Sequence, residues 1–233
     1  MLNNKWKKRF KRWFRLRFAI LYPLGIWAVI FGHSTDESIM RSIWFILLGL
    51  GIRSWANCYA IKMGKLTTSG PYAYVRHPLY LGSFLIMGGF LIMVNINWIV
   101  ILIFAMVVLG VVYKMTVVKE EEMLIDKFGN GYLEYKQSVP AFFPVFFPFK
   151  GGEKWGPRVE RYLRSQEYKL FIWVIVLVIV FHLKEEFIVE KESVNLKHIL
   201  WIVAAFLIGF LDFALSKIRK KFKKDPVTRE ECF

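Results

Sequence analysis

The sequence predicts an all-α fold, a polytopic integral membrane bundle of about six transmembrane helices. Two observations carry this prediction. Of the 233 residues, 56% are hydrophobic, and they come in long unbroken runs, not at the periodic positions typical of a water-soluble domain. The 33 Lys and Arg residues, which outnumber the 18 Asp and Glu residues, cluster at the ends of these runs. The six runs cover residues 18–32, 43–61, 79–94, 98–118, 170–183 and 199–215.

Each run accounts for one span. A transmembrane helix needs about 20 apolar residues at a rise of about 1.5 Å, so the shorter runs extend into flanking Trp, Tyr, Lys and Arg residues that reach the interface. Only Asn95, Ile96 and Asn97 separate the third run from the fourth, which predicts a tight antiparallel hairpin. Residues 1–17 carry eight Lys and Arg among aromatic residues and predict a basic amphipathic helix in the headgroup layer.

The distribution of basic residues predicts the orientation. With six spans, 28 of the 33 Lys and Arg residues lie on one side of the membrane, which identifies that side and both termini as cytoplasmic. Anionic membrane lipids therefore explain the net charge of +15 better than nucleic acid does. Two cysteines, Cys58 and Cys232, support neither a disulfide framework nor a Cys-based zinc site. His33, His182 and His198 share no metal-ligand spacing, so no metal is expected.

The loop before the third span collects polar side chains. Pro78 disfavours helical geometry at His77 and suits the first position of a helix, so His77 is expected at the helix N-cap. Arg76 and His77 then lie at a positive helix end, which favours a carboxylate or phosphate ligand. Tyr72 and Tyr80 are near enough in sequence to wall in that ligand.

The loop after the fourth span begins with acids. At about 100° per residue, Glu120 and Glu121 flank an apolar helical stripe. Two adjacent carboxylates at a membrane surface suit a bound cation. The alternative is a helix N-terminus that carries acids because they interact favourably with the helix dipole.

Both loops together carry a longer pattern. Its parts are Gly70-Pro71-Tyr72, Arg76-His77-Pro78-Leu79-Tyr80-Leu81-Gly82, Glu120-Glu121-x-x-Leu124-x-x-x-Phe128-Gly129-x-x-Tyr132-x-x-Tyr135 and Val139-Pro140. This pattern resembles the isoprenylcysteine carboxyl methyltransferase family and, more broadly, the membrane methyltransferases that include phospholipid N-methyltransferases. The resemblance covers residues 49–148 and leaves the last two predicted spans unmatched.

The resemblance implies a cytoplasmic pocket for S-adenosylmethionine and methyl transfer to a lipid, prenylated or other amphiphilic acceptor, with carboxylate O-methylation favoured. By motif position, the residues implied in the cofactor pocket are Tyr72, Arg76, His77, Tyr80, Glu120 and Glu121. Arg76, His77 and Glu121 are the implied catalytic residues. The residue types in this pocket suit the groups of the cofactor. Its ammonium calls for acids, its carboxylate for a basic site, and its sulfonium for aromatic faces.

On this interpretation residues 1–233 form a single membrane domain. Its parts are a basic interfacial segment at 1–17, a methyltransferase-like core at 49–148, an additional transmembrane hairpin at 165–216 and a basic tail at 217–233.

Three residues are candidates for binding the acceptor, and Arg76 is a further one if the acceptor is a carboxylate. Arg53 lies deep in the second run, where a charge is expensive; it either orients an acceptor carboxylate or pairs with another buried polar group. Phe142 and Phe143 lie in residues 139–150, a proline-rich segment in which Pro140, Pro144 and Pro148 forbid a regular helix. That segment either guides a lipid into the site or anchors the chain at the interface.

Two other functions are compatible with the sequence. Sterol reductases resemble this fold distantly, so a membrane NADPH-dependent reductase is one alternative, although the double glutamate fits a cationic cofactor better. A transporter or a membrane-interaction protein is the other, with Arg53, Arg76 and the acids along a solute path. A transporter is expected to show repeated halves, and the sequence shows no convincing repeat.

Overall fold

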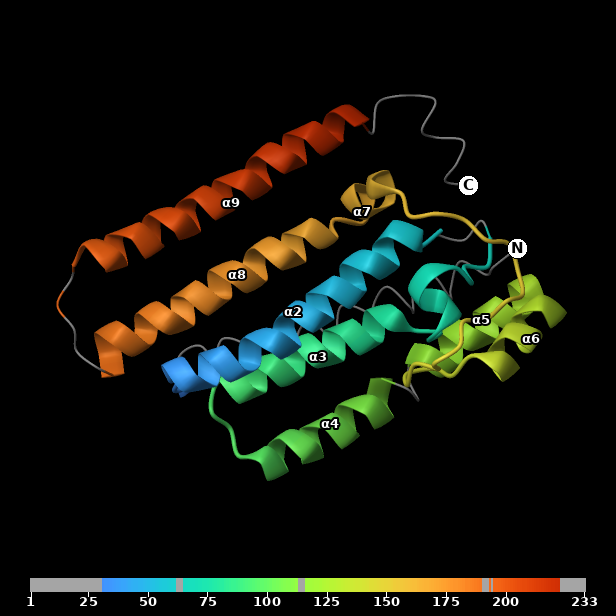
Figure 1. Cartoon of the computed structure of the whole chain (residues 1–233), viewed down its shortest axis with the longest axis horizontal. Helices are drawn as coiled ribbons and strands as arrows, with labels where there is room; N and C mark the ends of the chain where they lie inside the picture. The colour runs from blue at the N-terminus through green and yellow to red at the C-terminus, as the bar shows by residue number, and fades with distance from the viewer. Residues whose placement is uncertain (1–30, 62–64, 113–115, 190–192, 194, 223–233) are drawn as a thin grey trace, which may run out of the picture.

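The computed structural model describes residues 31–61, 65–112, 116–189, 193 and 195–222, and this part of the chain is helical (Figure 1). The all-α prediction is confirmed for these residues. The helices are α2 (Asp36–Tyr59), α3 (Pro78–Met93), α4 (Trp98–Val112), α5 (Val118–Phe128), α6 (Asn130–Ser138), α7 (Val159–Ser165), α8 (Glu167–Lys184) and α9 (Leu196–Phe222), with a short 3-10 turn η1 (Gly70–Ala73) and a π-helical turn η3 (Glu185–Val189).

Helices α2, α3, α4, α8 and α9 coincide with five of the predicted apolar runs. Two stretches, Asp36–Tyr59 and Leu196–Ala214, are long and apolar enough to cross a membrane, and Pro78–Met93 and Trp98–Val107 are shorter apolar helices. These features are those of a helical membrane protein, while the count of six spans stays a prediction. The basic segment 1–17 and nearly all of the first run lie outside the described residues.

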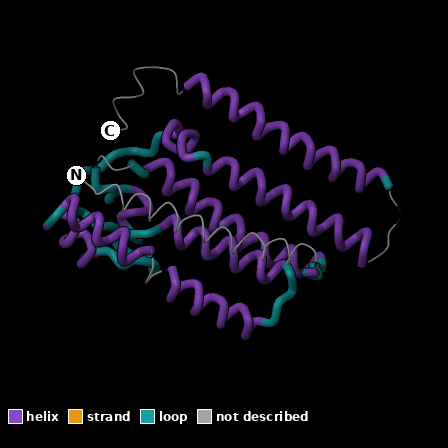
Figure 2. The backbone as a smooth tube through the Cα atoms, turned by 180° about the vertical axis from the view of Figure 1, so that it is seen from behind, coloured by secondary structure: helices purple, strands orange, loops and turns teal. Residues whose placement is uncertain are grey.

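Helices α2 and α3 pack against each other along their lengths at the centre of the molecule (Figure 1). Glycines allow this close approach, since a Cβ at Gly49 would lie 2.6 Å from the carbonyl oxygen of Gly82. Buried Ile46 and Ile86 continue the contact, which Val174 and Phe181 of α8 cover from the side. The two views agree that α9 lies along α8 at one edge of the bundle, while α4 lies at the opposite edge (Figure 2).

One ion pair ties α8 to this central pair of helices. The Arg53 guanidinium donates from Nε and Nη2 to the two carboxylate oxygens of Glu167, at 2.9 and 2.6 Å. Its Nη1 donates to the carbonyl oxygen of Leu79 at 2.9 Å and to the Ser83 hydroxyl. Arg53 on α2 therefore connects the first residue of α8 with the first turns of α3.

The opposite end of the bundle is held by acids and histidines. The Asp36 backbone N–H donates to Glu185 at 3.0 Å. Glu186 lies 3.0 Å from His198 Nε2 and 3.5 Å from His182 Nε2, and it also pairs with Lys197. These contacts join η3 to the starts of α2 and α9. No group of three or more potential metal ligands occurs in the part of the chain that the structure describes.

Candidate active site

The loop that carries Arg76 and His77 is fixed by its backbone. Gly70 begins η1 at φ +62°, where a side chain would collide with the ring of Tyr59. His77 is the N-cap of α3 and Pro78 is its first residue, as the sequence predicts. The backbone N–H groups of Arg76 and His77 donate to the carbonyl oxygens of Pro140 and Ala141, at 2.9 and 3.1 Å. The proline-rich segment is irregular, as predicted. Its backbone carbonyl groups therefore fix the position of the loop that carries Arg76 and His77.

The acids come from α5, and α6 closes the site from the other side. Gly129, at φ +55°, separates the two helices. On α6, Tyr132 and Tyr135 are buried, and the Tyr135 hydroxyl donates to the backbone carbonyl of Tyr72 at 2.6 Å. This bond ties α6 to the loop that carries Arg76.

Glu121 is the centre of the cluster. Its Oε1 lies 3.1 Å from Arg76 Nη1 and 3.4 Å from His77 Nε2, and its Oε2 lies 2.8 Å from Lys136 Nζ. The side chain is only 5% exposed. Burial alone raises the pKa of Glu121, but hydrogen bonds from His77 and Lys136 and the charge of Arg76 outweigh it and lower the pKa to about 2. Glu121 is therefore an ionised, buried counter-ion to the basic groups around it.

Glu120 differs from its neighbour in exposure. Its side chain is 41% exposed, and its Oε2 accepts a hydrogen bond from the Tyr80 hydroxyl at 3.1 Å. His77 Nδ1 lies 4.0 Å from the same oxygen. The sequence places both acids on the flanks of one stripe, and the structure gives them different environments: Glu121 faces the basic residues and Glu120 remains accessible.

Two features make the cluster chemically suited to a polar ligand. Arg76 is only 8% exposed, and its Nε makes no close hydrogen bond, although the Tyr132 phenol lies beside the guanidinium. On the other side, Glu120 presents an accessible carboxylate. A donor for an anion and an acceptor for a cation within one cluster suit a zwitterionic, amino-acid-like ligand.

Aromatic side chains surround this cluster. The ring of His77 lies 5.7 Å from that of Tyr80 and 6.4 Å from that of Phe142. Burial, followed by the charge of Glu120, raises the pKa of Tyr72, so this phenol stays protonated near the acids.

The structure thus brings together Tyr72, Arg76, His77, Tyr80, Glu120, Glu121 and Phe142. Phe143 is exposed, and Arg53 is engaged by Glu167. Arg53 is therefore paired with another buried polar group, which is the second of the two alternatives that the sequence leaves open. A role of Arg53 or Phe143 in binding the acceptor stays a prediction.

The structure shows two residues with important contacts that the sequence analysis does not predict. Lys136 contacts Glu121, and a weak signal exists for it, because Lys136 lies one helical turn after Tyr132 on the same face of the helix. Glu167 is 114 residues from Arg53 in sequence, and no local pattern links the two.

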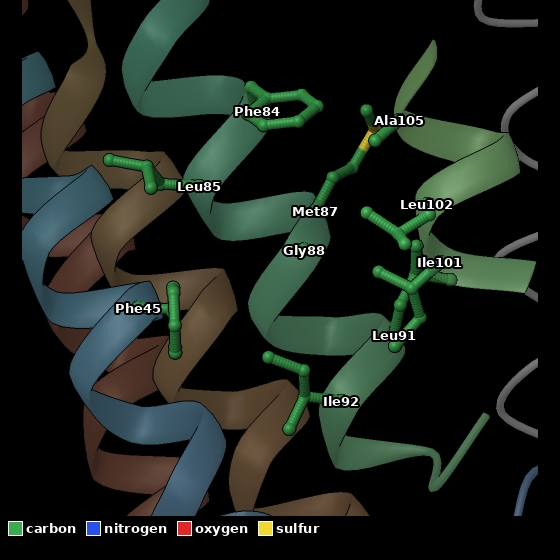
Figure 3. A pocket seen from close by; sticks show the side chains of 10 residues that line it. All are labelled: Phe45, Phe84, Leu85, Met87, Gly88, Leu91, Ile92, Ile101, Leu102 and Ala105. Atoms are coloured by element: carbon green, nitrogen blue, oxygen red, sulfur yellow. The ribbon is translucent and has the colours of Figure 1, made fainter. Parts of the chain in front are cut away.

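An apolar cavity of about 210 Å³ lies farther along α3, between α3 and α4 (Figure 3). Its lining residues are Phe45, Phe84, Leu85, Met87, Gly88, Leu91, Ile92, Ile101, Leu102 and Ala105. Phe84 is seven residues beyond His77, which corresponds to roughly 10 Å of helix. This cavity is distinct from the polar cluster, and the predicted cytoplasmic cofactor pocket stays a prediction.

The low pKa of Glu121 predicts how stability depends on pH. A folded-state pKa of about 2 against an ordinary value of 4.5 means that the folded chain binds this proton more weakly than the unfolded chain. The stabilisation is complete above about pH 4.5 and is lost as the pH falls toward about 2. Thermal unfolding in detergent should show a difference between wild type and Glu121→Gln that narrows over this interval. A difference that is constant with pH would contradict the assignment.

Comparisons with known proteins identify a matching family profile and several relatives. The profile of the phospholipid methyltransferase family matches residues 24–131. The protein-S-isoprenylcysteine O-methyltransferase of Schizosaccharomyces pombe is 34% identical over 96 residues, which are 40% of each chain. That of Mus musculus is 39% identical over 132 residues, 53% of this chain and 41% of its own. The chain thus spans about two fifths of these relatives.

A second group of relatives matches more of the length. The cobalt-zinc-cadmium resistance protein CzcN of Cupriavidus metallidurans is 29% identical over 169 residues, 64% of this chain and 76% of its own. No solved structure matches the chain.

Proposed function

We propose that the chain is a membrane methyltransferase of the isoprenylcysteine carboxyl methyltransferase type, which transfers a methyl group from S-adenosylmethionine to a lipid-like acceptor, with an acceptor carboxylate favoured. The observation that carries this proposal is the contact between Glu121 and the Arg76–His77 pair. Two motifs separated by 44 residues meet there in one buried cluster. Such a cluster is suited to the amino-acid part of the methyl donor.

The residues have distinct proposed roles toward this cofactor. Arg76 binds the cofactor carboxylate, because its guanidinium is the permanent cation at the start of α3 and its Nε is not used by Glu121. Glu120 binds the ammonium, because it is the accessible acid. Tyr72 and Tyr80 offer aromatic faces to the sulfonium. Glu121 holds Arg76 and His77 in place.

The cofactor supplies an activated methyl group, and transfer is a direct displacement at carbon. A carboxylate acceptor needs no general base, so this chain contributes mainly alignment and exclusion of water. An amine or hydroxyl acceptor would need a proton acceptor, and His77 is the residue placed for that role. Phe142, whose ring lies 6.4 Å from that of His77, is the aromatic residue that we propose to contact the acceptor.

A lipid-like acceptor is supported by the surroundings of the site. Phe143 and Phe146 of the proline-rich segment are exposed, as expected for side chains that meet lipid. The apolar cavity along α3 offers room for part of a hydrocarbon chain (Figure 3). The proposal includes one multi-pass membrane domain with six spans and both termini in the cytoplasm, which the distribution of Lys and Arg supports.

Calorimetric binding to the detergent-purified full chain tests the proposal. S-adenosylmethionine is expected to bind, and Glu120→Gln should weaken binding about tenfold or more, the effect of losing a charge-assisted hydrogen bond. Glu122→Gln is the matched control, because Glu122 is exposed on the same helix. Transfer of labelled methyl groups from the cofactor to a prenylated cysteine or to extracted lipids then identifies the acceptor class.

The same experiment separates the alternatives. NADPH is titrated in parallel, and binding of NADPH without S-adenosylmethionine would replace the proposal with the reductase. Binding of neither ligand by a folded sample would contradict an enzyme of either kind.

A further inference from the structure

Lys136 contacts the candidate site from α6, beyond the residues that the family profile matches. Its Nζ lies 2.8 Å from Oε2 of Glu121, while Arg76 and His77 approach the other oxygen. Each carboxylate oxygen therefore has its own partners. Lys136 is also the one of these three basic residues with a well-exposed side chain, at 40%.

The neutrality of the cluster depends on Lys136. Within it, Arg76 and Lys136 carry positive charge, Glu120 and Glu121 carry negative charge, and His77 contacts both acids. Without Lys136 the acids would outnumber the permanent cations. A carboxylate as buried as Glu121 would then bind a proton more readily, because burial disfavours its charge and only Arg76 and His77 would remain to offset that cost.

A neutral Glu121 would change the groups proposed to meet the ligand. Arg76 would lose the counter-ion that orients its guanidinium, and His77 would lose a carboxylate acceptor. The phenol of Tyr132 is buried beside these groups, and burial together with the charge of Glu121 raises its pKa, so it cannot replace the lost charge. Lys136 thus acts on Arg76 and His77 through Glu121.

We propose that Lys136 is a positioning residue of this site, which holds the Glu121 carboxylate ionised and oriented so that Arg76 and His77 keep their places. The proposal rests on the function proposed above, because the orientation of Arg76 matters through the ligand that it binds. Tyr135, one residue before Lys136, anchors this turn of α6 by its bond to Tyr72.

Infrared titration of the purified chain, without any cofactor, tests whether Lys136 keeps Glu121 ionised. Difference spectra against matching Glu121→Gln variants report the protonation of Glu121. Lys136→Met should raise the midpoint by about 1 to 3 pH units, the effect of removing an adjacent opposite charge. Lys136→Arg should restore the wild-type midpoint. Lys127→Met is the matched control, since Lys127 lies over the Phe128 ring on an exposed part of α5.

The pH profile of S-adenosylmethionine binding tests the second part. In Lys136→Met, the affinity for S-adenosylmethionine should decrease as Glu121 becomes protonated. This decrease should occur about 1 to 3 pH units higher than in wild type. An unchanged infrared midpoint would overturn the proposal, and so would a shifted midpoint with an unshifted binding profile. If the wild-type chain binds no S-adenosylmethionine, the proposed function fails, while the infrared midpoint still decides whether Lys136 controls Glu121.

Discussion

Replacing Arg76 with alanine is expected to lower both S-adenosylmethionine binding and methyl transfer by at least about 100-fold. The change removes the donor proposed for the cofactor carboxylate and also leaves Glu121 without its nearest guanidinium at 3.1 Å. Loss of a charge-assisted contact in a buried site costs about 3 kcal/mol or more, and each 1.4 kcal/mol is tenfold in affinity or rate. Calorimetry and a labelled-methyl assay measure the two effects.

Two further variants separate this result from simple unfolding. Arg76→Lys keeps the positive charge but loses the planar guanidinium with its paired N–H donors. This variant should therefore retain the fold and still bind the cofactor poorly. Lys65→Ala removes a cation from the same loop, where Lys65 forms an exposed ion pair with Glu153, and should have little effect. If Arg76→Ala impaired use of the acceptor while cofactor binding stayed normal, Arg76 would belong to the acceptor instead.

Breaking the Arg53–Glu167 ion pair is expected to cause the largest loss of stability. Either Arg53→Met or Glu167→Met leaves an uncompensated charge in a largely buried position, which costs about 3 to 5 kcal/mol. The double variant should be more stable than the sum of the two single effects predicts, because it removes both charges. Unfolding of the four proteins in detergent completes the double-mutant cycle.

Additive effects in this cycle would mean that the two residues do not stabilise each other, contrary to the two hydrogen bonds between them. The expected coupling has a structural consequence. Glu167 is the first residue of α8, beyond the matched profile, and Arg53 also bonds to the first turns of α3. The added C-terminal hairpin is thereby connected to the helix that begins at His77.

The amino-acid sequence by itself determined the fold class and the resemblance to membrane methyltransferases. Long apolar runs require helices, because a chain in lipid must satisfy its backbone hydrogen bonds within each segment. Local chemistry also predicted the N-cap at His77, the first helical position of Pro78 and the irregular proline-rich segment, all of which the structure confirms. The resemblance carried by the Arg-His-Pro and Glu-Glu motifs is confirmed by the matched profile and by the relatives. The six-span count and the cofactor pocket stay predictions.

Only the tertiary structure decided how the charged residues are paired. The sequence treats Glu120 and Glu121 alike, whereas packing buries Glu121 among Arg76, His77 and Lys136 and leaves Glu120 accessible. It also joins Arg53 to Glu167 across 114 residues. The physical reason is the distance along the chain over which each effect acts. Helix periods, caps and turns depend on neighbours within a few residues, whereas the energy of a buried charge depends on which distant partner the packed helices bring to it.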